Sequence, residues 1–365
     1  MKILMLNYEF PPLGGGAANA NRYILEELID RDIEIDLVTS SSEKYSEDNF
    51  SDNITIYRVN VGKESIHHWK QIEILRYMWK GLRKSIELKK KKDYDLVHAW
   101  AGFPCGLMAK MLGIPYIVGL RGSDVPGYNE RFSIQYIFLR PVVKSVWRSA
   151  KEVVPNSGGL RQLAGKTMDM EMKVIPNGID TSEFRPDYNY GGEKLEILCV
   201  SRLTPRKRVS DVIKAVEDLE GVKLTVIGEG QREKKLKGLL KNLEIENKVS
   251  FTGYVSHEKL PNKYQEADVF VIPSLNEGMS NTVLEAMASG LPIITTQTGG
   301  TDELIDKNGV VVPKKDPEAI KNHIIKYRDN PERVSRQGQK SRERAKQMSW
   351  ERVVEKYLET YRFYI

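Results

Sequence analysis

The stretch "DVFVIPSLNEGMSNTVLEAMASGLPIITT", Asp268 to Thr296, decides the fold. An apolar run leads through a turn that contains Gly278 into an amphipathic helix, and a second apolar run follows. Buried runs that alternate with helices are typical of parallel strands covered on both faces. The stretch also places Glu277 in the turn and Glu285, eight positions later, inside the helix. It therefore predicts one strand–helix–strand unit and raises the question of what two such carboxylates do.

The same alternation continues on both sides, so the sequence predicts an α/β protein with two doubly wound, Rossmann-like parallel sheets. Apolar runs predict strands at 2–8, 34–40, 54–59, 95–100, 115–120, 195–201, 222–228, 249–253, 268–274 and 292–296. Amphipathic runs predict helices at about 18–29, 66–91, 105–112, 131–149, 209–219, 231–243 and 257–264, besides the helix after Gly278.

The segment "KVIPNGIDTSEFRPDYNYGGEK", 173–194, is dense in Pro, Gly, Asn and Asp and separates the two halves as a hinge. We therefore expect an N-terminal domain at 1–175 and a C-terminal domain at 176–349. The final segment, 350–365, reads as an amphipathic helix that has to pack on one of them.

Composition limits the class of protein. A chain of 365 residues is longer than a domain with a single hydrophobic core usually is, so we expect two domains. A content of 40% hydrophobic and 29% charged residues is typical of a soluble globular chain. Cys105 and Cys199 are the only cysteines, so neither a disulfide framework nor a Cys-rich metal site is expected. The first residues read as a buried strand and not as a signal peptide, and the apolar region 96–120 as strand, helix, strand. We expect a cytoplasmic location, with a peripheral position at the inner membrane face as an option.

The net charge of +6 is partly local, in "LRKSIELKKKK" at 82–92 and "RLTPRKR" at 202–208. A modest, clustered excess suits phosphorylated ligands or an anionic membrane better than nucleic acid, so we expect no nucleic-acid partner.

Two segments that follow predicted strands are candidates for phosphate binding, because ligands of doubly wound sheets bind at the carboxyl ends of strands. Gly14 to Gly16 immediately precede a helix, although they do not form a dinucleotide fingerprint, since its third glycine would fall on Asn19. A flexible turn is the alternative. Arg202 and Lys207 lie in a strand-to-helix loop and suit a diphosphate, because Arg bridges oxygens and Lys neutralises charge. A solvated basic loop is the alternative there.

The turn after the strand at 268–274 gives the sharpest signal. Residues Gly278, Met279, Ser280 and Asn281 can present backbone N–H groups at a helix N-terminus, which is an anion site. Glu285, inside the helix, suits the two hydroxyls of a ribose, and Glu277 faces what lies beyond the phosphates. A pair of solvated helix carboxylates is the alternative.

Together these segments resemble the retaining glycosyltransferases of family 4 (glycosyl transferases group 1), which have the GT-B fold of two Rossmann-like domains facing an interdomain cleft. The similarity covers nearly the whole chain in order. The matching segments are "GGG" at 14–16, "VIPNGIDTSEFRP" at 174–186, "SRLTPRKR" at 201–208, "VIGEG" at 226–230, "VSFTGYV" at 249–255, the stretch 268–296 and "SW" at 349–350.

The resemblance implies that the C-terminal domain binds a nucleotide sugar and the N-terminal domain binds the acceptor, with helix 350–365 packing back on the latter. Glu277 and Glu285 would be the two acids of the family's E-x7-E motif, one near the sugar and one on the ribose. The remaining implied donor contacts are Arg202 and Lys207 on the diphosphate, Gly278 to Asn281 beside it, Tyr254 and Val255 at the base, and Gly15 and Gly16 closing over the phosphates. Glu277, Arg202 and Lys207 would carry catalysis.

The N-terminal half departs from the family pattern at two places. The frequent H-x-H keeps His98 but has Trp100 at its second position, and the frequent H-G-x-D appears as "RGSD", Arg121 to Asp124. We name His98, Arg121 and Asp124 as candidates for the acceptor or sugar cleft, and a hydrogen-bonded core histidine as the alternative for His98.

The implied activity is transfer of a sugar, with retention, from a nucleoside diphosphate sugar to a hydroxyl of a glycan, glycolipid or lipid-linked acceptor. A UDP-sugar is preferred because it is the commonest donor of the family. Cations and a helix N-terminus stabilise the departing diphosphate, so we expect no metal and no cofactor. "DYD" at 93–95 precedes its strand, at the wrong end for a metal site. The alternatives are a nucleotide-sugar epimerase or hydrolase, a dinucleotide-dependent oxidoreductase, and a non-catalytic nucleotide-sugar-binding protein.

Two predicted helices, 66–91 and 131–149, mix aromatic and aliphatic residues with Lys and Arg. Such helices can rest on an anionic bilayer beside a lipid-linked acceptor, whereas an ordinary packed core is the alternative.

Overall fold

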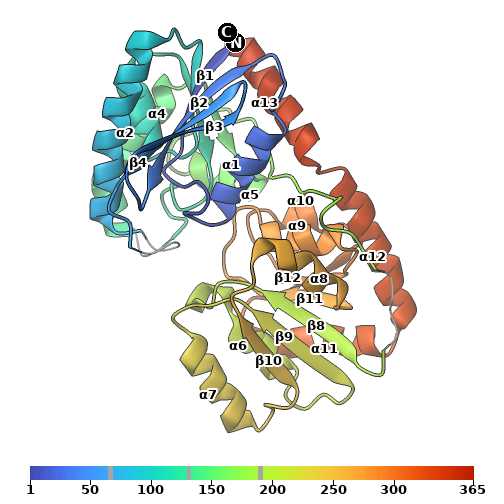
Figure 1. Ribbon diagram of the computed structural model, residues 1–365. Helices are drawn as coiled ribbons and strands as arrows, with labels where there is room; N and C mark the ends of the chain where they lie inside the picture. Colours follow the sequence, from blue (N-terminus) through green and yellow to red (C-terminus); the bar gives the residue numbers. More distant parts are fainter. Residues whose placement is uncertain (65–68, 130–132, 188–191) are drawn as a thin grey trace. The chain divides into compact units, whose positions relative to one another are not determined.

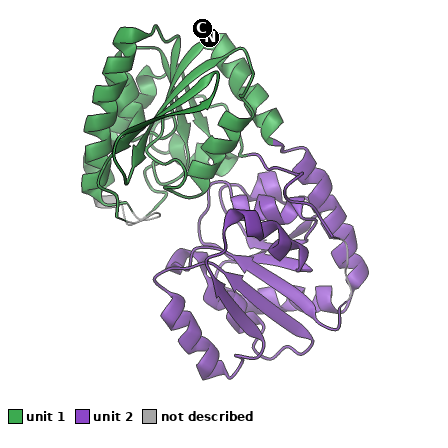
Figure 2. Ribbon diagram, viewed as in Figure 1, with its two compact units in different colours: residues 1–177, 350–365 green, residues 178–349 purple. Residues whose placement is uncertain are grey.

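A computed structural model describes residues 1–64, 69–129, 133–187 and 192–365 (Figure 1). The chain forms two units, Met1–Asn177 with Trp350–Ile365, and Gly178–Ser349 (Figure 2). Each contains one α/β sheet, so the predicted architecture of two parallel-sheet domains is confirmed. The predicted boundaries, at 175/176 and 349/350, lie within two residues of these divisions. Residues 66 and 131, where two predicted helices begin, and 188–191 of the predicted hinge lie outside the described residues.

The first sheet has the strand order β3-β4-β2-β1-β5-β6-β7. Its neighbours pair in parallel except β3, which pairs antiparallel with β4 at the edge. The order reverses between β1 and β5, so the loops that leave these two strands lie at the switch point of the sheet. The strands are β1 (Lys2–Leu6), β2 (Glu34–Ser41), β3 (Ser46–Ser51), β4 (Ile54–Asn60), β5 (Leu96–Ala99), β6 (Tyr116–Leu120) and β7 (Glu152–Pro155).

Helices cover both faces of this sheet. One apolar cluster joins the sheet to α2 (Gln71–Lys91), α3 (Cys105–Leu112), α4 (Ser133–Ser149) and α5 (Gly158–Gly165). A second cluster joins the opposite face to α1 (Gly16–Glu26) and to the last helix, α13 (Trp350–Tyr364). The C-terminal helix thus completes the core of the N-terminal unit, as the amphipathic pattern of the final segment required.

Aromatic side chains hold α13 in place. The ring of Trp350 stacks on Tyr23 of α1 at a centroid distance of 5.4 Å. Tyr361 is fully buried, and its hydroxyl lies 2.7 Å from Nδ1 of His98 in β5. Because these contacts bury α13 in the apolar cluster that it shares with α1, the core of the N-terminal unit includes the last turns of the chain.

The second sheet has the order β10-β9-β8-β11-β12-β13, and all its pairs are parallel. The order reverses between β8 and β11, which are neighbours. The strands are β8 (Leu195–Val200), β9 (Val222–Ile227), β10 (Val249–Gly253), β11 (Val269–Ile272), β12 (Ile293–Thr296) and β13 (Gly309–Val312). The helices are η2 (Pro205–Lys207), α6 (Val209–Ala215), α7 (Glu233–Leu243), η3 (His257–Lys259), α8 (Leu260–Gln265), α9 (Asn281–Ala288), α10 (Thr301–Leu304), α11 (Pro317–Arg328) and α12 (Pro331–Lys346).

Several elements differ from the sequence prediction. The helix predicted at 257–264 is a 3-10 turn followed by a short α-helix that starts with Leu260 and Pro261. Proline lacks an amide hydrogen and is favoured in the first turn of a helix, which agrees with a start of the α-helix there. The sequence analysis did not predict β3, β7 or β13, nor α5, α10, α11 and α12. The unpredicted strands are short, and β3 is largely polar.

We predict that Tyr361→Ala lowers the free energy of unfolding of the N-terminal unit by about 3–5 kcal/mol, because it removes a fully buried ring from the core. All five tryptophans lie in that unit, so denaturation followed by tryptophan fluorescence reports its unfolding. Phe363→Ala in the same helix is the control, since Phe363 is 79% exposed. Equal effects of the two substitutions would contradict the docking of α13.

Candidate functional site

The loops that leave β8 and β11 lie side by side, because these strands are neighbours and run parallel. The switch point of a doubly wound sheet is where its ligands bind. Arg202 and Lys207 are on the first loop, and Glu277 is on the second. The backbone ties the two loops together: the N–H of Leu275 donates to the carbonyl oxygen of Arg206 at 2.8 Å.

An ion pair spans the switch point. The ammonium of Lys207 donates to Oε1 of Glu277, and both side chains are about nine-tenths buried. Burial alone would raise the pKa of Glu277, but the charges of Lys207 and Arg206 more than offset it and hold that pKa below its usual range. The site therefore holds a negative charge and a positive charge in contact. Arg202, on the same loop as Lys207, is exposed.

The N-terminus of α9 begins four residues after Glu277, at Asn281. Residues 278–280 approach it in a tight turn that is pressed against the loop after β12: a Cβ added to Gly300 would lie 2.4 Å from the carbonyl oxygen of Gly278. The N–H of Gly299 donates to the carbonyl oxygen of Glu277 at 2.9 Å. A helix N-terminus so fixed presents backbone N–H groups and the positive end of the helix dipole to an anion.

The loops after β9 and β10 complete this end of the sheet. Gly228 has φ +126° and its absent Cβ would overlap the carbonyl oxygen of Ser201, so only glycine allows the two loops to approach. Glu229 accepts a hydrogen bond from the N–H of Tyr254 at 3.3 Å, which fixes the backbone before Val255. The ring of Tyr254 is 63% exposed and is available for stacking. Glu229 was not predicted as a site residue, although it lies in the family-like segment "VIGEG" at 226–230.

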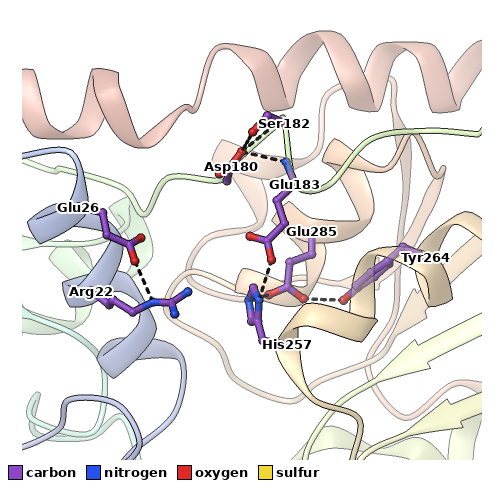
Figure 3. Close-up of polar contacts among 8 residues, drawn as sticks. All are labelled: Arg22, Glu26, Asp180, Ser182, Glu183, His257, Tyr264 and Glu285. Carbon is purple, nitrogen blue, oxygen red and sulfur yellow. Dashed lines mark hydrogen bonds and ion pairs between the residues drawn. The ribbon is translucent and has the colours of Figure 1, made fainter.

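Glu285 lies one turn inside α9 and is buried (Figure 3). Its Oε2 accepts a hydrogen bond from the hydroxyl of Tyr264 in α8 at 2.7 Å, and its Oε1 lies 3.9 Å from Nε2 of His257. The other nitrogen of His257, Nδ1, lies 3.2 Å from Oε1 of Glu183. The sequence analysis did not name Tyr264, His257 or Glu183. The first two fall in the helix predicted at 257–264, but nothing in that pattern indicated that they face Glu285.

Burial raises the pKa of Glu285, and the nearby Glu183 raises it further, whereas the charge of His257 and the hydrogen bond from Tyr264 lower it. The net direction is upward, opposite to that of Glu277. Two acids eight positions apart therefore have different environments, one paired with a lysine and one in a network of an imidazole and a phenol.

The N-terminal candidates are mostly buried. His98 is fully buried, its Nδ1 is next to Tyr361, and burial with the charge of Arg121 holds its pKa well below its usual range. This is the geometry of the hydrogen-bonded core histidine that the sequence analysis weighed against a cleft role. Asp124 is buried as well and accepts hydrogen bonds from the N–H groups of Gly102, Arg121 and Gly122, at 2.8–3.0 Å.

The two departures from the family pattern contact each other. The guanidinium of Arg121 lies 3.7 Å from the ring centre of Trp100, which is a cation–π contact. Its Nη2 donates to the hydroxyl of Tyr357 at 2.7 Å and its Nη1 to Oδ1 of Asn177 at 3.2 Å. Arg121 thus connects β6 to the C-terminal helix. The roles predicted for His98, Arg121 and Asp124 toward an acceptor or sugar stay predictions.

Gly14 to Gly16 follow β1 and lead directly into α1, which begins at Gly16. A Cβ added to Gly14 would lie 2.8 Å from Cβ of Glu9, whereas Gly15 has open space around it. The loop connects a strand to a helix, as predicted, and because it leaves β1 it lies at the switch point of the first sheet. The contact of Gly15 and Gly16 with a donor stays a prediction.

Comparison with known proteins identifies two families. Residues 14–183 match the family described as Glycosyltransferase Family 4, and residues 180–344 match Glycosyl transferases group 1, so the two matches together run from 14 to 344. An uncharacterised glycosyltransferase of Methanocaldococcus jannaschii is 26% identical over 97% of this chain and 96% of its own.

Two further proteins are similar to this chain. The alpha-monoglucosyldiacylglycerol synthase of Streptococcus pneumoniae is 29% identical over 60% of this chain and 55% of its own. The crystal structure of Anabaena HepE in complex with UDP and glucose has a TM-score of 0.78 at 19% identity and covers 99% of both chains. The latter similarity shows the GT-B fold alone.

We predict that Lys207→Met lowers the free energy of unfolding of the C-terminal unit by about 3–5 kcal/mol, because it leaves the buried carboxylate of Glu277 without its counter-charge. The tryptophans lie in the other unit, so the far-UV circular dichroism transition should shift without a matching shift in tryptophan fluorescence. Arg202→Met, on the same loop but exposed, should change stability by no more than about 0.5 kcal/mol.

The pH dependence gives the sign of the effect. Because the folded-state pKa of Glu277 is lowered, its stabilising contribution is present above the unfolded-state pKa and is lost as pH falls through the folded-state pKa. In Lys207→Met, burial raises the pKa of Glu277 and the lysine no longer lowers it. Protonation of Glu277 then removes the cost of an unpaired buried charge and stabilises the variant. The deficit should therefore shrink between about pH 7 and about pH 4, and a deficit that grew on acidification would contradict the pairing.

Proposed function

Because the chain belongs to glycosyltransferase family 4 and is a glycosyltransferase of the GT-B type, we propose that it transfers a sugar, with retention, from a nucleoside diphosphate sugar to a hydroxyl group. The proposed donor is a UDP-sugar, and the acceptor is a glycan, glycolipid or lipid-linked saccharide. The observation that carries the donor site is the pair of Lys207 and Glu277 at the switch point of the second sheet, beside the N-terminus of α9.

The departing diphosphate gains negative charge as the sugar–phosphate bond breaks. Lys207, the exposed Arg202 and the N–H groups at residues 278–281 are the groups at this end of the sheet that stabilise such charge. Lys207 is held by Glu277 before the donor arrives, so binding of the diphosphate exchanges one anionic partner of the ammonium for another. This exchange leaves Glu277 free to accept from sugar hydroxyls. These cations suffice for the charge, and the proposal includes no metal.

The remaining donor contacts are proposed from the resemblance to the family. Glu285 accepts from the ribose hydroxyls, Tyr254 and Val255 contact the base, and Gly15 and Gly16 contact the phosphates. Retention is proposed through attack on the same face of the sugar, with the leaving phosphate as base.

The preference for a UDP donor comes from the resemblance to the family, and the solved Anabaena structure of the same fold contains UDP and glucose. An epimerase or hydrolase on the same fold is the second candidate, and a non-catalytic nucleotide-sugar-binding protein is the third. The transferase is preferred because the full-length relative and the family match are both glycosyltransferases.

A lipid-linked acceptor is supported by an apolar and basic face of the N-terminal unit. We call it the α2–α3–α4 face, since α3 contacts both neighbouring helices and all three cover the same side of the sheet. Seven of the twelve large apolar side chains that are exposed among the described residues belong to it: Ile72, Leu75, Trp79, Ile86, Met111, Ile137 and Phe138.

The charge of this face is strongly positive. The three helices contain eleven Lys and Arg and two Glu, a formal charge of +9, whereas the whole chain carries +6. Apolar side chains at helical spacing with lysines and arginines around them suit the surface of an anionic bilayer. The proposal is therefore peripheral contact with an anionic membrane. Among the described residues, no helix combines the length and apolarity that a membrane span requires.

The reaction is tested by incubating UDP-, GDP- and ADP-sugars with and without candidate acceptors. We expect nucleotide release that depends on the acceptor, and a product whose anomeric configuration, measured by NMR, equals that of the donor. Consumption of donor without acceptor would indicate the epimerase or hydrolase, binding without turnover the non-catalytic protein, and an inverted product would contradict retention.

Membrane contact is tested by co-sedimentation with phosphatidylglycerol vesicles at low salt. We expect binding that is lost at high salt and on phosphatidylcholine, and a roughly tenfold weaker partition for Trp79→Glu, which removes an interfacial ring and adds a negative charge. Phe363→Glu is the matched control, because Phe363 is a large exposed ring like Trp79, at 79% against 62%, but belongs to α13. Equal losses in both variants would contradict the assignment to the α2–α3–α4 face.

A further inference from the structure

His257 lies between two carboxylates that come from distant parts of the chain. Its Nδ1 is 3.2 Å from Glu183, on the segment that enters the C-terminal unit, and its Nε2 is 3.9 Å from Glu285 in α9 (Figure 3). The imidazole is the only kind of side chain that can contact a carboxylate through each of two nitrogens while its charge changes near neutral pH. Its position therefore connects the entry segment to the second acid of the site.

The Glu183 side of this connection is fixed. Oδ1 of Asp180 accepts hydrogen bonds from the N–H groups of Ser182 and Glu183 at 2.7 and 3.0 Å, which closes a turn at the start of the segment. The next residue, Phe184, is fully buried and meets the ring of His257 edge-on, at a centroid distance of 5.4 Å. The imidazole thus has one nitrogen and one edge anchored.

The Glu285 side is held by two groups. Tyr264 donates to Oε2, so that oxygen is committed to the protein. Oε1 is at ion-pair distance from Nε2 of His257 but beyond hydrogen-bond distance. Tyr264 itself packs edge-on against Phe184 at 5.8 Å, so both partners of Glu285 rest on one buried ring. One oxygen of the carboxylate is therefore hydrogen-bonded to Tyr264, and the other contacts the imidazole without a hydrogen bond to it.

We propose that His257 is a positioning residue that, anchored on Glu183, holds Glu285 ionised and oriented with Oε1 toward the ribose hydroxyls of a bound nucleotide. This inference rests on the proposed ribose role of Glu285. The groups that face the imidazole are Glu183 from the entry segment, Glu285 from α9 and Phe184, with Tyr264 of α8 behind Glu285. Glu258 and Lys259 are its charged neighbours in η3.

The position of His257 next to Glu285 predicts how nucleotide binding changes with pH. An ionised carboxylate only accepts hydrogen bonds, whereas a protonated carboxyl group keeps part of that acceptor capacity, so nucleotide binding weakens as pH falls through the pKa of Glu285. Burial raises that pKa and the charge of His257 lowers it. At acidic pH an imidazole is positively charged, so its removal moves the acidic limb of binding to higher pH.

The test compares wild type with His257→Gln, using UDP, GDP and ADP and their 2′-deoxy forms as probes in calorimetric titrations across pH. For the nucleotide that wild type binds best, we expect His257→Gln to weaken binding by roughly 5- to 30-fold and to shift the acidic limb upward. The 2′-deoxy form should lose much less, because it lacks one of the hydroxyls that Glu285 holds. Glu183→Gln should weaken binding in the same direction, and adding it to His257→Gln should have little further effect.

His323→Gln is the matched control: His323 lies in α11 of the same unit, outside this network. It should leave affinity and pH profile unchanged. If His257→Gln weakens the ribo and deoxy nucleotides equally with an unshifted acidic limb, His257 only supports the fold and the inference is wrong. If His257→Gln behaves as wild type, the inference is wrong while the proposed function stands. If wild type binds none of the three nucleotides, the proposed function fails and the inference with it.

Discussion

The ion pair between Lys207 and Glu277 joins the two loops on either side of the point where the second sheet reverses its strand order. Loops that diverge from a switch point leave a gap at the sheet edge, and here a buried pair of opposite charges occupies it. A buried pair of this kind adds little net stability, because both charges lose their hydration. Its presence is better explained by function, since an ammonium already held in place needs only to exchange its carboxylate for a phosphate.

The rest of the C-terminal unit supports that exchange. Gly228 allows its loop to lie against Ser201 in the loop after β8. Gly300 allows the loop after β12 to lie against residues 278–279, directly before the N-terminus of α9. The two acids of the stretch then differ in environment: Glu277 is paired with a cation, whereas Glu285 is buried with a phenol and an imidazole. In the N-terminal unit, the two residues that depart from the family pattern have structural contacts. Arg121 and Trp100 stack and hold the C-terminal helix, so this part of the chain contributes a stable scaffold with a basic, apolar outer face.

The sequence predicted the fold well where the spacing of apolar residues and the residue types of the flanking loops indicate the same element. Apolar runs followed by glycine-containing loops identified most strands, and the position of a loop after its strand placed Lys207 and Glu277 at the same edge. The pattern of apolar residues did not indicate β3, "SEDNFS", because this edge strand is polar and is stabilised by pairing with its single neighbour β4. It was also uninformative for the network of Glu285, because Glu183 and His257 are 74 positions apart and meet only through the tertiary fold. The pattern was equally uninformative for the partner of His98, because Tyr361 of α13 lies 263 positions away and contacts its Nδ1 only in the folded chain.

In the proposed mechanism Lys207 leaves Glu277 and binds the diphosphate. The affinity of Glu277→Gln for UDP measures whether the carboxylate competes for this lysine. A neutral amide competes less for the ammonium, so the account predicts that this variant binds UDP at least as tightly as wild type, while its rate of sugar transfer falls by roughly 100-fold or more. Titration calorimetry gives the affinity, and the transfer assay shows the loss. Clearly weaker UDP binding by Glu277→Gln would contradict the account, because the carboxylate would then be helping to bind the diphosphate and not competing for its lysine.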